Sequence, residues 1–263
     1  MSNVLRTLLT ALIVVGVAGA ASAAGWGDLK GRFVYEGDPP RPKVIDIAGK
    51  DADDFGKLTL KDESLLADKD GGLANVVIYL RASKVDVHPD VSKDVGKQAV
   101  LDNKDAAFVP RVLPVWRQKQ TLLLTNSDPV AHNCNLQPLL DLAANPLLLS
   151  GGQSEHKFNR DQKVPVPVVC NLHPWMQGYV LPRSNPYLAV SAPDGAFQID
   201  KLPAGKREFQ VWQERAGFVA KDGWNQGRFT VEIKPGQTTD LGTIKLQPQL
   251  FKSRGETERK EKT

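Results

Sequence analysis

The chain has 263 residues, of which 41% are hydrophobic and 24% are charged, so it is able to bury a core of ordinary size. The formal net charge is only +4, and the basic residues are interleaved with acidic ones instead of forming a stripe. This pattern argues against a nucleic-acid partner. The 22 glycines and 18 prolines favour many short strands over long helices.

The N-terminus has the order of a secretory signal peptide. Arg6 precedes an apolar run over residues 8–17, and small residues follow up to Ala23. This order predicts a signal peptide over residues 1–23 that is cleaved after Ala23. The alternative is an uncleaved anchor, but the run is short of the roughly 20 residues that a spanning helix needs. We therefore expect a periplasmic or otherwise exported protein without stable membrane insertion.

Short apolar or alternating segments, separated by turns rich in glycine and proline, make up most of the remaining chain. Residues 43–72 predict a long loop or a short helix, residues 139–149 are the one apolar stretch with helical character, and residues 248–263 predict a disordered tail. This organisation predicts an all-β protein built as a sandwich or barrel. The expected strands cover residues 29–35, 75–80, 108–113, 120–125, 164–169, 178–181, 196–199, 208–212 and 227–233.

The residues that indicate chemistry are concentrated in one short segment after the expected strand 164–169. Cys170, His173 and Met176 follow one another at spacings of three, and Pro174 keeps this segment out of a helix. A thiolate, an imidazole and a thioether are three of the four ligands of a blue-copper site, which needs a second imidazole. Met176 is the only methionine besides the initiator, so its position is difficult to ascribe to chance.

The pattern Cys-x-x-His-Pro-aromatic-Met resembles the copper loop of the cupredoxins, the type 1 (blue) copper family, and in particular the short amicyanin-like loop. Asn126 followed by His132 and Asn133 resembles the first-ligand strand of the same family. The resemblance covers about residues 98–186. It implies a Greek-key β-sandwich with one type 1 copper held by His132, Cys170, His173 and Met176. It also implies that Asn133 joins the His132 strand to the Cys170 loop by hydrogen bonds.

A second resemblance concerns the chain on either side of residues 98–186. Residues 194–205 resemble the second half of a carboxypeptidase-regulatory-like (transthyretin-type) sandwich, in which Asp194-Gly195 opens a hairpin. We expect a second, smaller β-sandwich made of residues 28–97 and 187–247, with the copper domain inserted between its two parts. The alternative is two domains in series.

Cys134 departs from the copper pattern. In an exported protein the ordinary expectation for two cysteines is a disulfide, and a Cys134–Cys170 bridge would leave no thiolate for copper. The chain would then be a structural or adhesion sandwich. A free, buried Cys134 is the interpretation that also explains the spacing of His173 and Met176.

The function that these residues favour is single-electron transfer between redox partners, one of which docks near His173 and Trp175. In this interpretation the ring edge of His173 is the part of the site nearest to solvent. An enzyme would need a further histidine cluster with an open position, and only His88 and His156 remain, far apart in sequence. We therefore expect a carrier and not an enzyme, and we expect both of these histidines to be exposed.

Overall fold

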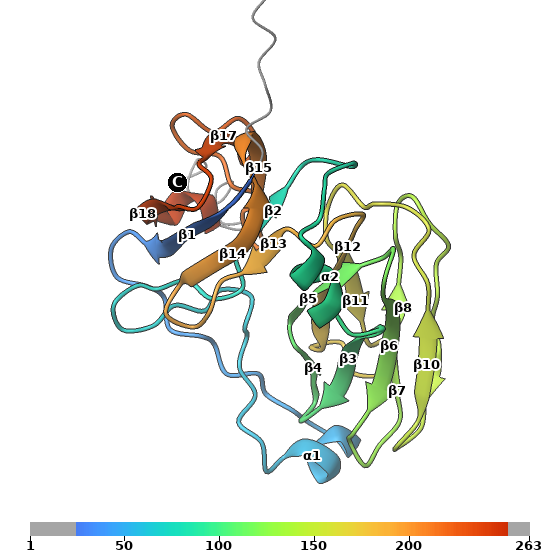
Figure 1. Ribbon diagram of the computed structural model, residues 1–263. Coiled ribbons are helices and arrows are strands. Elements are labelled where there is room, and N and C mark those ends of the chain that lie inside the picture. Colours follow the sequence, from blue (N-terminus) through green and yellow to red (C-terminus); the bar gives the residue numbers. More distant parts are fainter. Residues whose placement is uncertain (1–24, 252–263) are drawn as a thin grey trace, which may run out of the picture.

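The structure, a computed structural model, describes residues 25–251, so the predicted signal peptide lies outside the described residues. The described part is almost entirely β, as the sequence predicted (Figure 1). No helix between residues 25 and 251 is long and apolar enough to cross a membrane. The elements in chain order are β1 (Trp26–Tyr35), α1 (Lys50–Phe55), β2 (Val77–Leu80), α2 (Pro89–Asp94), β3 (Gln98–Lys104), β4 (Ala107–Val109), β5 (Val112–Trp116), β6 (Thr121–Asn126), β7 (His132–Asn133), β8 (Asn135–Leu136), β9 (Leu147–Leu148), β10 (Gln153–His156), β11 (Val166–Val169), β12 (Gln177–Arg183), β13 (Leu188–Val190), β14 (Ala196–Pro203), β15 (Gly205–Gln213), β16 (Gly217–Phe218), β17 (Arg228–Ile233), β18 (Thr238–Leu246) and the 3₁₀ helix η1 (Pro248–Phe251).

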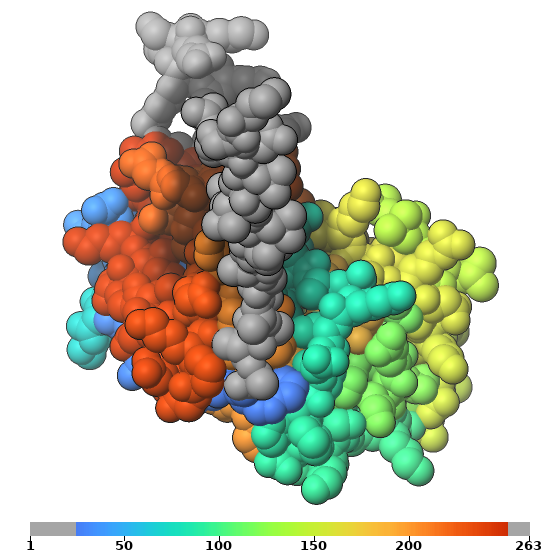
Figure 2. Space-filling model, turned by 45° about the horizontal axis from the view of Figure 1, so that its top comes forward, coloured from blue at the N-terminus to red at the C-terminus, as the bar shows by residue number. Residues whose placement is uncertain are grey.

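The strands pair in two groups. Strand β1 pairs with β14 and β18, and β2 pairs with β13 and β15, so the start of the chain is joined to its end. Strands β3 to β12 pair only among themselves. We call the first group the flanking sandwich and the second the central sandwich. They lie side by side, with the blue and the orange-to-red parts of the described chain on one side and its green and yellow middle on the other (Figure 2). The domain limits 28–97, 98–186 and 187–247 stay a prediction.

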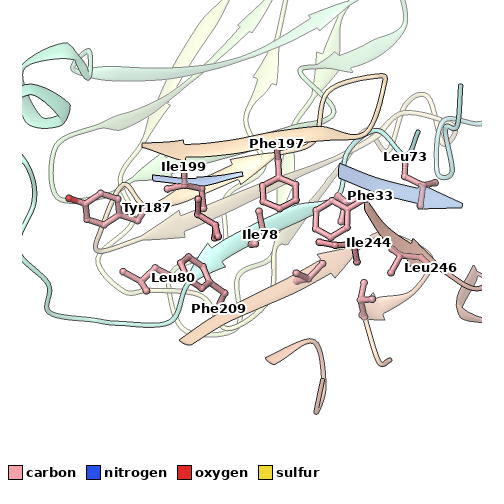
Figure 3. Close-up of a cluster of buried hydrophobic side chains, with 14 of the residues drawn as sticks. Phe33, Leu73, Ile78, Leu80, Tyr187, Phe197, Ile199, Phe209, Ile244 and Leu246 are labelled. Carbon is pink, nitrogen blue, oxygen red and sulfur yellow. The ribbon is translucent and has the colours of Figure 1, made fainter. Parts of the chain in front are cut away.

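Each sandwich encloses its own apolar core. In the flanking sandwich, Phe33 of β1 stacks on Phe197 of β14 with ring centroids 4.8 Å apart, and Ile78 and Phe209 pack beside them (Figure 3). The central sandwich has a four-stranded sheet, β10-β6-β3-β4, and a second one, β5-β12-β11-β8. Strand β6 alternates buried and half-buried residues because only one of its faces meets the core.

Strand β2 is buried along its whole length because it serves two cores at once. Ile78 and Leu80 point into the flanking core, whereas Val77 and Tyr79 pack against the central sandwich. At the same junction Tyr179 of β12 meets Trp212 of β15, with ring centroids 4.8 Å apart. The continuous apolar sequence of β2 is therefore explained by burial on both faces.

Residues 139–149 do not form a helix: Pro138 and Pro146 bracket and break this stretch, as the sequence indicated, and β9 is its one regular element. Two predictions about local structure were wrong. The single strand predicted over 108–113 is divided into β4 and β5. Within the predicted disordered tail, residues 248–251 form η1, because Phe251 is buried and stacks on Tyr35.

Candidate metal centre

Three of the four predicted ligands are brought together by the strands that carry them. His132 is the first residue of β7, and Cys170 follows directly after β11. These two places are neighbours because β8, which follows β7, pairs with β11 through Asn135 and Val169. His173 lies in the short loop between β11 and β12. Residues 38 positions apart in the sequence thus reach the same end of the central sandwich.

The ligand atoms of these three residues point toward one another. The Nδ1 atoms of His132 and His173 are 2.9 Å apart, and the Cys170 Sγ lies 3.8 Å and 3.6 Å from them. One ligand atom from each residue lies within 4.8 Å of the others. All three side chains are buried. The arrangement is a compact set of two imidazole nitrogens and one sulfur.

Met176 closes the loop around this set. Its backbone N–H donates to the His173 carbonyl at 2.9 Å, and its own carbonyl accepts from the Cys170 N–H at 3.2 Å. The side chain is 1% exposed and belongs to the core of the central sandwich. These bonds hold Met176 beside the cluster, and its role as a weak axial ligand stays a prediction.

Asn133 connects the two halves of the site, as the sequence predicted. Its side-chain Oδ1 accepts the backbone N–H of Asn171 at 2.8 Å and of Leu172 at 3.3 Å. Its Nδ2 donates to Asn145. The residue next to His132 therefore fixes the backbone of the loop that carries Cys170 and His173.

Asp128 is a contact of the site that the sequence did not reveal. Its Oδ2 lies 2.9 Å from His132 Nε2, and its side chain is 6% exposed. Asp128 stands in an Asn-Ser-Asp-Pro segment, a pattern typical of a turn residue that bonds to its own backbone. The sequence feature that could have indicated this contact is the position of Asp128, four residues before the predicted ligand His132.

Both imidazoles are suited to bind a metal at neutral pH. Burial, followed by the proximity of His173, lowers the pKa of His132 below its usual value. Burial also lowers the pKa of His173, against the opposing influence of Asp51. The neutral form of an imidazole is the one that binds a metal. Two neutral imidazoles and a cysteine sulfur fit the trigonal His₂Cys set that copper prefers, so the residues present fit this ion.

His173 is the most exposed of the four predicted ligands, at 6% against 0–1% for the others, as the sequence predicted, but its ring is covered and does not reach the surface. Its side chain is 8% exposed, because residues 43–62 extend from the flanking sandwich to the site and place α1 over it. We call these residues the α1 arm. Its outgoing and returning segments are joined by bonds from Ile45 N–H to Leu60 O at 2.9 Å and from Asp62 N–H to Lys43 O at 2.8 Å. In Figure 1, α1 lies away from β1, beside the central sandwich.

Phe55 is the residue through which the α1 arm covers the site. It is 2% exposed, and its ring centroid lies 5.3 Å from that of His173 and 6.0 Å from that of His132. Trp175 packs edge-on against the same ring at 6.3 Å. From the first turn of α1, Asp51 approaches His173 Nε2 to 3.8 Å, which is longer than a hydrogen bond. The apolar cover therefore comes from one ring, and the charged contact is weak.

Both cysteines are free and buried, so the structure does not contain the alternative Cys134–Cys170 disulfide. Cys134 lies in the core of the central sandwich and accepts a hydrogen bond from Asn103 Nδ2 at 3.3 Å. Burial raises the pKa of its thiol to about 11. Cys134 thus behaves as a small apolar residue, and Cys170 is the cysteine that meets the imidazoles.

The two remaining histidines take no part in the cluster. Both are half-buried, and not exposed as the sequence suggested. His88 caps the N-terminus of α2, where its Nδ1 accepts the Asp90 N–H at 3.2 Å. His156 lies at the end of β10 and packs edge-on against Phe158, with ring centroids 4.6 Å apart.

Comparison with known proteins gives only distant likenesses. No family model matches the chain, and no curated protein matches it. Among solved structures, a copper-containing nitrite reductase from Thermus scotoductus is 18% identical at a TM-score of 0.31, over 38% of this chain and 28% of that one. A purple cupredoxin from Nitrosopumilus maritimus is 26% identical at a TM-score of 0.25, over 33% of this chain and 98% of that one. A single-residue mutant of amicyanin, in its Cu(I) form, is 16% identical at a TM-score of 0.29, over 40% of this chain and 98% of that one. Likenesses at this level do not establish a family for this chain.

Proposed function

We propose that this protein is an exported type 1 copper protein that carries single electrons between redox partners. The observation that carries the proposal is the convergence of His132 Nδ1, His173 Nδ1 and Cys170 Sγ within 4.8 Å at a buried position. A copper ion held by this set would accept and release one electron at a time. One ion, with Met176 as the fourth ligand, is the arrangement that the loop favours.

The residues of the chain perform three tasks in this proposal. His132, Cys170 and His173 provide the trigonal donors, and Asn133 holds the backbone of the loop in place by two hydrogen bonds. The core of the central sandwich surrounds the sulfur of Cys170 and the side chain of Met176. Rigid ligands and the exclusion of water allow an electron to enter or leave with little rearrangement of the site.

A redox protein is proposed to dock near His173 and Trp175. Because Phe55 covers the ring of His173, such a partner meets α1 together with the exposed part of the loop. Leu172, which is 50% exposed, offers an apolar contact there. Contacts of this kind between redox proteins are small, typically below about 1,200 Å² in total.

We propose a carrier and not a self-contained copper enzyme. A catalytic metal needs several ligands and an open position for substrate. Among the described residues, His132, Cys170 and His173 are the one group of at least three His, Cys, Asp or Glu side chains placed to hold a metal. An oxidase or reductase assay with the copper-loaded chain tests this part of the proposal, and steady turnover without a partner would contradict it.

The absorption spectrum of the copper-loaded, oxidised protein tests the main proposal. We expect an intense visible band from the bond between the Cys170 sulfur and copper. Cys170→Ser should abolish the band, whereas the matched control Cys134→Ser should keep it, because the Cys134 sulfur bonds to Asn103 and not to the predicted ligands. A colourless wild-type protein that holds one copper would contradict the type 1 assignment.

A further inference from the structure

The carboxylate of Asp128 contacts the ring nitrogen of His132 that points away from Cys170 and His173. Asp128 is 5% exposed, and its Oδ2 lies 2.9 Å from His132 Nε2. The same carboxylate accepts two backbone N–H groups, so the geometry favours His132 Nε2 as the donor in this contact. His132 Nδ1, the atom that faces Cys170 and His173, is then left without a proton.

The same carboxylate holds the turn between β3 and β4. Asp128 Oδ1 accepts the N–H of Asp105 at 2.6 Å, and Oδ2 accepts the N–H of Ala106 at 3.0 Å. Both turn residues have left-handed backbone angles, with φ of 54° and 57°. Two such residues in succession are ordinarily Asn-Gly or Asp-Gly, and an alanine there is strained. The turn is thus kept in an unfavourable conformation in which two N–H groups point at one carboxylate.

The strained turn also touches the metal-binding loop. Trp175 Nε1 donates to the Ala106 carbonyl at 3.2 Å. The Asp105-Ala106 turn therefore bonds both to Asp128, which contacts His132, and to Trp175, which precedes Met176. Strained residues of this kind persist where the surrounding structure fixes them, and they are frequent at functional sites.

We propose that Asp128 is a positioning residue that orients His132 for copper and lowers the reduction potential of the site. This inference rests on the proposed function. A carboxylate that accepts the second ring N–H of a metal-binding histidine fixes the orientation of the ring and raises its basicity. Its negative charge also favours Cu(II) over Cu(I). Asp128 acts through His132 and does not itself bind the metal.

The test compares Asp128→Asn with Asp102→Asn. The control removes the same charge from β3, where Asp102 accepts hydrogen bonds from Thr125 and Ser127 and contacts no predicted ligand. Cu(II) and Cu(I) affinities and the reduction potential are measured for both variants. We expect Asp128→Asn to weaken copper binding by about 10–100-fold and to raise the potential. Each tenfold loss of Cu(II) affinity beyond that of Cu(I) corresponds to about 59 mV.

A second substitution separates positioning from a structural role. Ala106→Gly removes the strain of the left-handed turn without restoring the charge. In the Asp128→Asn background it should recover thermal stability and leave the potential raised. If Ala106→Gly restored both the thermal stability and the wild-type reduction potential in the Asp128→Asn background, Asp128 would have a structural role only. That result would overturn the proposal.

The proton on His132 provides a readout that needs no copper. We expect ¹⁵N NMR of the metal-free wild-type protein to show His132 protonated at Nε2. Protonation at Nδ1 would overturn the proposal, as would a potential and copper affinities for Asp128→Asn equal to those of Asp102→Asn. A wild-type protein without a blue band would instead contradict the type 1 assignment, while the NMR result would still decide whether Asp128 orients His132.

Discussion

The two imidazoles of the site are held in different ways. His132 is 0% exposed, and its Nε2 bonds to a carboxylate that belongs to the same sandwich. The outer ring nitrogen of His173 meets no hydrogen-bond partner among the described residues, only Asp51 at 3.8 Å, and its cover is Phe55 of the α1 arm. One side of the site is thus built into the central sandwich, and the other is closed by a segment from a remote part of the chain.

This difference predicts different roles for the two sides of the site. Bonds within one core fix ligand geometry, because a buried network has few alternative arrangements. Helix α1 has six residues, of which only Phe55 is buried, and segments with few buried apolar side chains open at low cost. We expect changes on the His132 side to alter the properties of the metal, and changes on the His173 side to alter access to it.

The largest effect on the His173 side is expected from Phe55→Ala, which removes the cover. Loss of a buried phenylalanine ring costs about 3–5 kcal/mol in a core, and we expect a value at or below about 3 kcal/mol here because α1 is short. The copper should react several-fold faster with a small soluble oxidant, while the visible spectrum stays close to that of the wild type. Stopped-flow kinetics and chemical denaturation measure the two effects.

Leu58→Ala is the matched control for Phe55→Ala. Leu58 lies three residues later in the α1 arm and is 36% exposed, so its truncation should change neither the reaction rate nor the spectrum appreciably. Equal rates for wild type and Phe55→Ala would show that Phe55 does not limit access, and the comparison between the two sides would fail.

An intermediate effect is expected from Met176→Leu, which tests the inner side. The side chains have similar volumes, so the free energy of unfolding should change by less than about 1.5 kcal/mol. Copper should remain bound and coloured, and the reduction potential should rise because a weak thioether ligand is lost. Voltammetry and copper analysis provide the measurement. Complete loss of copper would mean that Met176 anchors the metal and does not only tune it.

The smallest effect is expected from Asp51→Asn. Its carboxylate is about one-third exposed and lies 3.8 Å from His173, so the pair should contribute no more than about 1 kcal/mol, and less at high salt. The reduction potential should move less than it does in Asp128→Asn. Asp53→Asn, an exposed position in the same helix, serves as the control. A shift as large as that of Asp128→Asn would erase the distinction between the two sides.

The sequence alone predicted the all-β class, which the structure confirms, and a set of candidate ligands, which stays a prediction, largely from local signals. Strand periodicity and turn residues act over a few positions, and the Cys170 loop contains three of the predicted ligands within seven residues. His132 was found through its resemblance to a first-ligand strand. The bridge by Asn133, which the same resemblance implied, is confirmed by its bond to the Asn171 N–H.

Only the tertiary structure shows which segments that are distant in the sequence come into contact. The α1 arm reaches the site because residues 43–62 leave one sandwich and cross to another, and no local pattern encodes that path. The roles of Asp128 and of the Asp105-Ala106 turn depend likewise on two segments meeting in space. Local propensities determine which residues are strands and which can be ligands. Packing, which is a property of the whole chain, determines what covers the predicted ligands and what holds them in place.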